Sequence, residues 1–238
     1  MSRGGALVTG SAKGIGRGIA LALAREGYDV AIHFRSSAAE AEATRAEVEA
    51  LGARGIALQA DLRDRGAAAA LVRDAHAGLG GLAVLVNNVG NYVYKPLDEL
   101  SVDEWDDVFA TNLDATFATC REVVPLMRAA GGGRIVNLGY AGAQNLVARP
   151  NLTAYAIAKT GVVLLTKAIA RAEAGNGITA NVVAPGVIEN SATKPLGEIP
   201  AGREGRIDEV AAAVVYFASP DAAYVTGQVL EVAGGWNL

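Results

Sequence analysis

Residues 6–16 read ALVTGSAKGIG, a short apolar run that leads directly into a turn rich in glycine. The run predicts a buried strand, and the apolar periodicity after the turn predicts a helix. Glycines at such a turn let the backbone approach a pyrophosphate, and the start of the helix offers free N–H groups and a positive dipole end. The stretch therefore predicts a dinucleotide-binding turn. Its candidate contact residues are Gly10, Ser11, Lys13, Gly14, Ile15 and Gly16.

The same order of strand and helix continues along the chain. Short apolar runs are expected as strands at 6–9, 29–34, 55–61, 82–88, 134–139, 178–185 and 228–233. Longer Ala-rich segments between them are expected as helices at 14–27, 38–52, 65–80, 102–130 and 154–174. Parallel strands need a covering helix in each right-handed crossover, so the pattern predicts a doubly wound parallel sheet of about seven strands with helices on both faces. No linker interrupts it, and we expect one Rossmann-type domain over residues 1–238.

Composition excludes several classes of function. The net charge of −4 is spread along the chain, which argues against a nucleic-acid or membrane-surface footprint. Cys120 is the only cysteine, which excludes an intrachain disulfide and a Cys-based zinc site. His33 and His76 have no neighbouring ligand pattern, so we interpret them as structural and expect no metal. The N-terminal stretch has no signal-peptide pattern, and a cytoplasmic protein is expected.

Six motifs together resemble the short-chain dehydrogenase/reductase family, and the resemblance covers essentially the whole chain. They are Thr9-Gly10-x-x-x-Gly14-x-Gly16, Asp61, Asn87-Asn88-Val89-Gly90, Asn112, Tyr155-x-x-x-Lys159 and Pro185-Gly186. Within the family the sequence is most like the 3-oxoacyl-[acyl-carrier-protein] reductase group, including VTGQVLEVAGG at 225–235. The resemblance implies an oxidoreductase with a nicotinamide cofactor and a homotetramer or homodimer.

The end of the second expected strand favours NADP over NAD. An NAD site usually places an acidic side chain there, whereas a 2'-phosphate needs cations. The sequence has HFRSS at 33–37, and no carboxylate. The candidate phosphate contacts are Arg35, Ser36 and Ser37, with Lys13 from the first turn. The resemblance further implies that Asp61 and Leu62 contact the adenine, that Asn88, Val89 and Gly90 line the ribose, and that Val187 and Ile188 follow Pro185-Gly186 to the nicotinamide.

Tyr155 and Lys159 are the candidate proton-transfer pair. One helical turn separates them, so both side chains project from one face. We expect the lysine ammonium and the positive nicotinamide to lower the pKa of the phenol from its ordinary value near 10. By resemblance, the lysine also bonds the nicotinamide ribose, and Asn112 supports a proton-relay water.

The serine that family members carry after the fifth strand is missing. No serine lies between Ser101 and Ser191, and Tyr140 stands at the expected position. Tyr140 offers a hydroxyl on a longer arm, although a packing role for its ring remains equally open. Gln144, Asn145 and Thr153 are further candidate donors. Losing one such donor costs on the order of a hundredfold in rate, so an altered enzyme is expected rather than an inactive one.

The substrate side offers less specific signals. The segment at 189–206 is shorter than the paired lid helices of the family, which predicts an open cleft. Tyr92 and Tyr94 follow the fourth strand and either clamp a flat substrate or pack at an interface. Trp236 and Leu238 form an apolar C-terminus that is expected to dock on another subunit.

Three functional hypotheses follow from these residues. The first is an NADPH-dependent carbonyl reductase in which Tyr155 protonates the carbonyl oxygen. The second is a pteridine reductase, since such family members can depart from serine and hold a flat ring. The third, from a different class, is a non-catalytic NADP-binding sensor.

Overall fold

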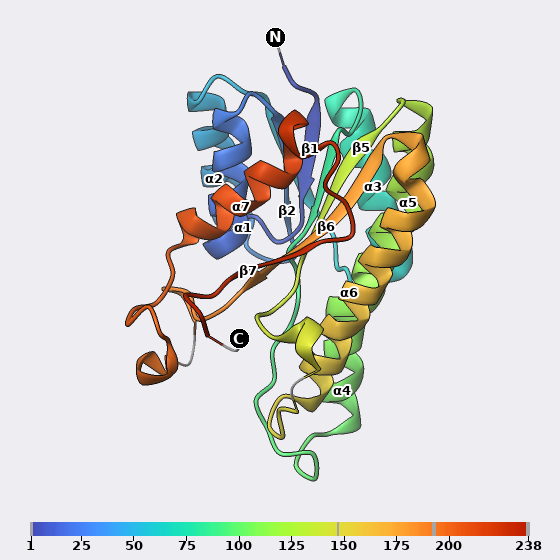
Figure 1. The fold of residues 1–238 in the computed structure, drawn as a ribbon. Coiled ribbons are helices and arrows are strands. Elements are labelled where there is room, and N and C mark those ends of the chain that lie inside the picture. Colours follow the sequence, from blue (N-terminus) through green and yellow to red (C-terminus); the bar gives the residue numbers. More distant parts are fainter. Residues whose placement is uncertain (1, 147, 192–193, 237–238) are drawn as a thin grey trace.

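Seven parallel strands form one twisted sheet in the computed structural model, which describes residues 2–146, 148–191 and 194–236 (Figure 1). Their order is β3-β2-β1-β4-β5-β6-β7, and every pairing is parallel. The strands are β1 (Gly5–Val8), β2 (Asp29–Phe34), β3 (Gly55–Gln59), β4 (Val84–Asn87), β5 (Gly133–Leu138), β6 (Ile178–Pro185) and β7 (Val229–Val232). The predicted doubly wound parallel sheet is confirmed.

Helices cover both faces of the sheet (Figure 1). On one face lie α1 (Gly14–Arg25), α2 (Ala38–Ala50) and α7 (Ile207–Ala218). On the other lie α3 (Arg65–Leu79), α4 (Val102–Phe109), α5 (Ala115–Ala129) and α6 (Thr153–Glu173). A π-helical turn, η1 (Ala110–Asp114), joins α4 to α5, so the helix expected at 102–130 is continuous but irregular. Short 3-10 turns are η2 (Ala143–Asn145), η3 (Ala174–Asn176), η4 (Leu196–Glu198) and η5 (Pro220–Ala222).

Two apolar layers hold the helices on the sheet. Ile19 and Phe217 belong to the layer beneath α1 and α7, while Met127 and Ile135 belong to the layer beneath α3 and α5. All four are at most 2% exposed. Since full burial of one such side chain contributes about 1.5–3 kcal/mol, these layers fix the helix positions. Helix α7 was not among the predicted elements.

The carboxyl ends of the strands meet at the lower end of the molecule in Figure 1. Strand order reverses between β1 and β4, because β2 and β3 lie to one side of β1 and β5 to β7 beyond β4. Open α/β sheets bind ligands at such a switch point. The turn after β1 and the segment after β4 therefore mark the candidate site.

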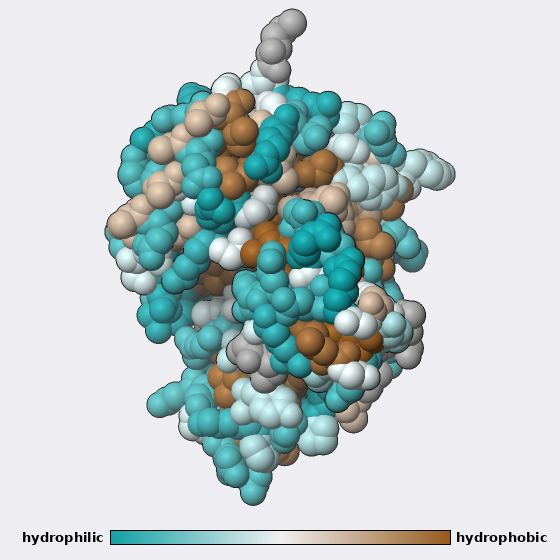
Figure 2. Space-filling model, turned by 90° about the vertical axis from the view of Figure 1, so that its left-hand side faces the viewer, coloured by the Kyte–Doolittle hydropathy of each residue, from teal (hydrophilic) through white to brown (hydrophobic). Residues whose placement is uncertain are grey.

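The surface is mixed in character. Figure 2 shows a mainly hydrophilic face on which hydrophobic residues gather in separate small patches. Among the described residues, Thr153–Asn176 is the one helix long and apolar enough to cross a membrane. In the fold this helix packs on β6 and α4.

Candidate active site

The turn after β1 exposes its backbone because glycines occupy it. Gly10 and Gly14 have φ values of +63° and +60°, which L side chains rarely adopt. A Cβ on Gly16 would lie 2.3 Å from the carbonyl oxygen of Gly10. Asn88 fastens the turn from β4 by donating through Nδ2 to the carbonyls of Thr9 (3.0 Å) and Gly10 (3.2 Å). This cradle fits a dinucleotide pyrophosphate at the start of α1.

His33 supports this turn, a role that the sequence analysis missed. Its Nδ1 accepts a hydrogen bond of 2.9 Å from the N–H of Gly10, and its Nε2 lies 3.1 Å from the carbonyl oxygen of Ala60. Burial lowers the pKa of His33, so the ring stays neutral and can accept at Nδ1. Ser11 is also buried, and its hydroxyl donates inward to Val8, which leaves its backbone as its means of contacting a cofactor.

A cavity of about 250 Å³ continues from the turn toward β2 and β3. It brings together most of the predicted adenosine and phosphate contacts, with His33, Phe34, Ala60 and Thr111 in addition. The predicted residues that line it are Gly10, Lys13, Arg35, Ser36, Ser37, Asp61, Leu62 and Val89. Arg35 and Ser36 are exposed at its rim. The Arg63 guanidinium, hydrogen-bonded to Asp61, lowers the pKa of that carboxyl to about 2.

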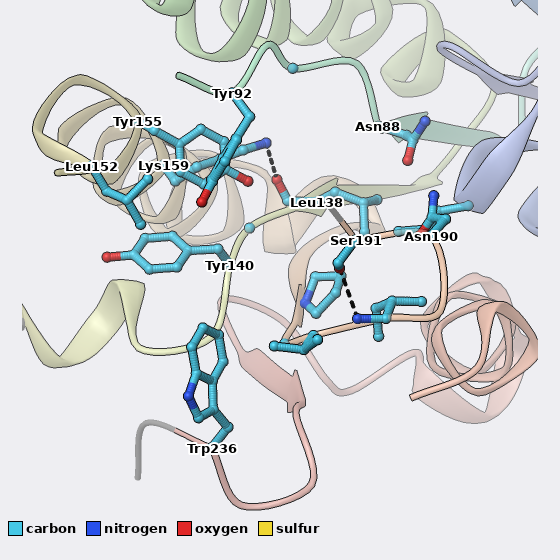
Figure 3. Close-up of a pocket in the computed structure, with 17 residues that line it drawn as sticks. Asn88, Tyr92, Leu138, Tyr140, Leu152, Tyr155, Lys159, Asn190, Ser191 and Trp236 are labelled. Carbon is cyan, nitrogen blue, oxygen red and sulfur yellow. Dashed lines mark hydrogen bonds between the residues drawn. The ribbon is translucent and has the colours of Figure 1, made fainter. Parts of the chain in front are cut away.

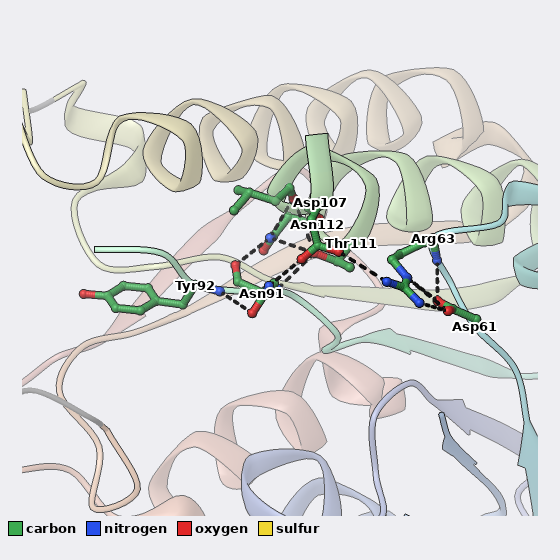
Figure 4. Close-up of polar contacts among 8 residues, drawn as sticks. Asp61, Arg63, Asn91, Tyr92, Asp107, Thr111 and Asn112 are labelled. Atoms are coloured by element: carbon green, nitrogen blue, oxygen red, sulfur yellow. Dashed lines mark hydrogen bonds and ion pairs between the residues drawn. The ribbon is translucent and has the colours of Figure 1, made fainter. Parts of the chain in front are cut away.

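Asn112 lies in the π-helical turn, and its side chain is hydrogen-bonded to two backbone carbonyls. Its Nδ2 donates to the carbonyl of Val108, one α-helical turn earlier, and to the carbonyl of Asn91, both at 2.9 Å (Figure 4). Its Oδ1 is buried and has no hydrogen-bond partner among the described residues. A Cβ on Gly90 would lie 2.1 Å from this Oδ1 and 3.3 Å from Lys159 Nζ. The orphan oxygen thus faces the same small space as the lysine, as the predicted water relay requires.

Tyr155 and Lys159 lie together in the wall of a second cavity, separate from the one beside β2 and β3. Lys159 Nζ donates a hydrogen bond of 2.6 Å to the carbonyl of Leu138 and lies 5.8 Å from the centroid of the Tyr155 ring. Burial lowers the pKa of Lys159 to about 8. Burial raises the pKa of Tyr155, and the phenols of Tyr92 and Tyr140 raise it further. At neutral pH the pair is a neutral phenol beside an ammonium.

The pKa expected for Tyr155 therefore differs from the one that the structure gives. We expected a lowered value, but that lowering relies in part on the positive charge of an oxidised nicotinamide. In the protein alone, burial and the phenols of Tyr92 and Tyr140 all raise the pKa of Tyr155. A neutral phenol is the form that can donate a proton to a substrate, whereas a phenolate can only accept one.

The second cavity, of about 450 Å³, lies at the carboxyl ends of β4, β5 and β6 (Figure 3). The predicted residues that line it are Ile15, Asn88, Gly90, Tyr92, Tyr140, Tyr155, Lys159, Pro185, Gly186, Val187 and Ile188. The residues that sequence reasoning did not assign to it are Leu138, Gly139, Leu152, Asn190, Ser191 and Trp236. The first cavity lies beside β2 and β3, and the second lies at the carboxyl ends of β4, β5 and β6.

Tyr140 does not present its hydroxyl to that position. Figure 3 shows its ring in the cavity wall with the oxygen pointing away from Tyr155 and Lys159. The rings of Tyr140 and Tyr155 pack at 5.6 Å between centroids. Burial raises the pKa of Tyr140. The charge of Arg149 lowers this pKa, and the charge of Glu231 raises it. The geometry favours the packing role for Tyr140 over the predicted replacement of serine.

The other predicted donors lie elsewhere. Gln144 and Asn145 are exposed on η2, and Thr153 lines a different cavity and donates toward Pro150. Tyr94 is 57% exposed, and its hydroxyl accepts from Asn151, outside the lining of either cavity.

The segment that follows β6 and the C-terminus complete the site. Between 194 and 206 the described chain has one 3-10 turn, η4, and no lid helix, in line with the predicted short lid. Trp236 lines the cavity of its own subunit, with the Arg149 guanidinium 5.1 Å from its ring centroid, although docking on another subunit was expected. Leu238 lies outside the described residues.

Comparisons with known proteins match this architecture over its whole length. The family model described as enoyl-(acyl carrier protein) reductase matches residues 10–237. The chain is 39% identical over 242 residues to the 3-oxoacyl-[acyl-carrier-protein] reductase FabG of Staphylococcus aureus, covering 98% of each protein. Among solved structures, a blue fluorescent protein from a metagenomic library in complex with NADPH matches with a TM-score of 0.93 and 34% identity, covering 100% of this chain and 99% of that one.

An acetoin dehydrogenase from Enterobacter cloacae matches with a TM-score of 0.91 and 34% identity, covering 98% of this chain and 95% of that one. These matches span the turn after β1 and the helix that carries Tyr155 and Lys159. They agree with the motif-based resemblance and with the parallel sheet. The chain belongs to the short-chain dehydrogenase/reductase family and is an oxidoreductase that acts on CH–OH or carbonyl groups with a nicotinamide cofactor.

Proposed function

We propose that the protein is an NADPH-dependent carbonyl reductase most like 3-oxoacyl-[acyl-carrier-protein] reductase. The observation that carries this proposal is the meeting of Tyr155, Lys159 and the orphan Oδ1 of Asn112 at one end of a dinucleotide-shaped site. Bound nicotinamide supplies the hydride. Tyr155 donates its proton to the carbonyl oxygen, and Lys159 with Asn112 holds the water that restores it.

Lys159 has a second task in this proposal. Its ammonium already bonds the carbonyl of Leu138 at the end of β5, which fixes its position. With a pKa of about 8 it keeps its charge at neutral pH, and a positive charge there stabilises the phenolate that Tyr155 becomes after proton transfer. Activity in the reductive direction should therefore decline as the pH rises through the range in which Lys159 loses its proton.

NADPH is proposed over NADH because cations gather at the ribose end of the site. Lys13 and Arg35 line that cavity with the hydroxyls of Ser36 and Ser37. The carboxylate present, Asp61, is paired with Arg63. A 2'-phosphate placed there would meet two cations and two hydroxyls. A structural neighbour with the same fold is in complex with NADPH.

Replacing Arg35 with alanine is expected to weaken NADPH binding by about tenfold or more, because a hydrogen bond to a charged group contributes about 1.5–3 kcal/mol. NADH affinity should stay unchanged, since NADH carries no 2'-phosphate. Fluorescence titration of both cofactors measures the two dissociation constants. Arg171→Ala, exposed at the far end of α6, is the matched control. Equal losses for both cofactors would contradict the assignment of Arg35 to the phosphate.

The substrate remains a choice between two classes of carbonyl or imine. A 3-oxoacyl thioester on a carrier is favoured by the curated relatives and by the short segment after β6, which leaves the cleft open. A pteridine reductase is favoured by the aromatic cavity wall, in which Tyr92, Tyr140 and Trp236 could hold a flat ring.

The experiment follows NADPH oxidation at 340 nm with acetoacetyl thioester, dihydropterin and activated ketones, with NADH as the cofactor control. We expect turnover of the thioester, at a higher kcat/KM than that of the dihydropterin. Preference for the dihydropterin would move the assignment to the second class. NADPH binding without turnover of any substrate would favour the non-catalytic sensor over both enzymes.

We also propose a cytoplasmic homotetramer or homodimer. Phe117 on α5 and Ile157 and Leu164 on α6 are exposed by 43%, 48% and 70%, which leaves an apolar helix face for a second copy. Light scattering of the purified protein gives the number of subunits, and a monomer would contradict the proposal.

A further inference from the structure

Carbonyl reduction at Tyr155 calls for a second hydrogen-bond donor. Negative charge develops on the carbonyl oxygen as the hydride arrives, and a preorganised donor stabilises it. The family's serine is absent, and the hydroxyl of Tyr140, which stands in its place, points away from Tyr155 (Figure 3). The question is which group of this chain takes over.

Four of the described residues that line the cavity carry hydroxyl groups. Tyr155 is the proton donor, and Tyr140 turns its oxygen away. Ser191 lies on the segment after β6, apart from Tyr155, where its Oγ accepts a hydrogen bond of 2.9 Å from the N–H of Ile188 (Figure 3). The fourth is Tyr92, which follows β4.

Tyr92 lies directly against Tyr155. Their rings make an edge-to-face contact with centroids 5.2 Å apart and an interplanar angle of 77°. Figure 3 shows the Tyr92 and Tyr155 side chains close together in the wall of the same cavity. The Tyr92 phenol also raises the pKa of Tyr155, as a group close in space does. A substrate oxygen at Tyr155 therefore comes within reach of Tyr92.

The backbone of Tyr92 is fixed to the helix that holds Asn112 (Figure 4). Asn91 Oδ1 accepts from the N–H of Tyr92 at 3.0 Å, and its Nδ2 donates to Asp107. The N–H of Asn91 donates to Thr111 at 3.1 Å, and its carbonyl accepts from Asn112 at 2.9 Å. Three bonds through Asn91 thus tie the loop to α4 and η1, and a fourth fixes the backbone of Tyr92 to Asn91. Such tethering gives the preorganisation that a catalytic donor needs.

We propose that Tyr92 supplies the second hydroxyl of this active site and donates a hydrogen bond to the substrate's carbonyl oxygen beside Tyr155. The inference rests on the proposed carbonyl reductase function. It places the donor on the segment after β4, whereas the family's serine follows β5. The competing role for Tyr92 is that of an aromatic clamp, which needs the ring and not the hydroxyl.

Tyr92→Phe separates these roles, because it removes the hydroxyl and keeps the edge-to-face contact. We expect kcat/KM for the best carbonyl substrate to fall by about a hundredfold, mostly through kcat. Tyr140→Phe should cost less than Tyr92→Phe. Tyr94→Phe, a neighbouring exposed phenol outside the cavity, should match the parent.

Binding in a catalytically silent background gives a second measurement. In Tyr155→Phe loaded with NADPH, calorimetry measures the dissociation constant of the ketone without turnover. Adding Tyr92→Phe should raise this constant by about threefold to tenfold, the effect of one lost hydrogen bond. A clamp would leave it unchanged.

The outcomes keep this inference apart from the proposed function. Normal activity of Tyr92→Phe, beside an inactive Tyr155→Phe, overturns the role of Tyr92 and leaves the reductase assignment intact. A larger loss in Tyr140→Phe than in Tyr92→Phe assigns the donor to Tyr140 and also overturns the inference. A parent protein that reduces no carbonyl substrate overturns both.

Discussion

Tyr155→Phe is expected to lower kcat by about a thousandfold or more, because it removes the proton donor while retaining the ring. General acid catalysis contributes 10²–10⁴-fold, and Tyr155 is a neutral phenol in the cavity wall whose ring centroid lies 5.8 Å from the Lys159 ammonium. The ring contacts with Tyr92 and Tyr140 persist in the variant, since they involve the aromatic faces and edges. The measurement is NADPH oxidation under saturating substrate.

The same variant should bind NADPH with the affinity of the parent. Phenylalanine removes no contact of the turn after β1 or of the Arg35 region. Fluorescence titration with NADPH therefore serves as the internal control for cofactor binding. Tyr94→Phe shows what the loss of a phenol hydroxyl outside the cavity does to activity. A variant with parental turnover would remove Tyr155 from the mechanism and contradict its assignment as the proton donor.

Local signals in the sequence were sufficient for most of the fold. Strands β2 and β6 have the predicted bounds because each is a short segment rich in apolar residues that lies between two helical patterns. The turn at Gly10 was predicted because it depends on a local feature. Its backbone has a positive φ, a conformation that glycine adopts readily. Helix α7 was not predicted, since its run VAAAVVYFA is apolar nearly all round and periodicity alone does not separate such a segment from a buried strand.

The candidate site was predictable in its members more than in their orientation. The motifs predicted Asn112, Tyr155 and Lys159 as site residues. In the structure Tyr155 and Lys159 line one cavity, and a Cβ on Gly90 would lie 2.1 Å from Asn112 Oδ1 and 3.3 Å from Lys159 Nζ. The position of Tyr140 in sequence did not reveal that its hydroxyl turns away, because packing against Ala143, Val163 and Tyr155 determines the direction of its ring. Orientation of this kind depends on residues from several elements.

Long-range contacts were beyond sequence reasoning for a different reason. The bond between His33 Nδ1 and the Gly10 N–H joins β2 to the turn after β1, and nothing in either local pattern indicates it. Trp236, near the end of the chain, lines the cavity. Its apolar side chain was equally compatible with the subunit contact that the sequence predicted. Each of these placements follows from the assembled sheet and not from a motif.

Gly16→Ala is expected to weaken NADPH binding by about tenfold to a hundredfold and to lower the free energy of unfolding by about 1–3 kcal/mol, the usual cost of overpacking. The added Cβ would lie 2.3 Å from the Gly10 carbonyl oxygen and 2.7 Å from Asn88 Nδ2. The first of these atoms is backbone, and the second holds the turn to β4 through its bonds to Thr9 and Gly10. The methyl group can be accommodated only by moving the cradle.

Cofactor titration and chemical denaturation measure the two effects separately. Gly175→Ala is the matched control, because its Cβ would have no heavy atom of the described residues within 4 Å and it lies on η3, away from the turn. A Gly16→Ala protein that binds NADPH like the parent would show that the turn can open without loss. The pyrophosphate would then have to be held by groups other than the backbone of residues 10–16, which would contradict the assignment of this turn as the dinucleotide cradle.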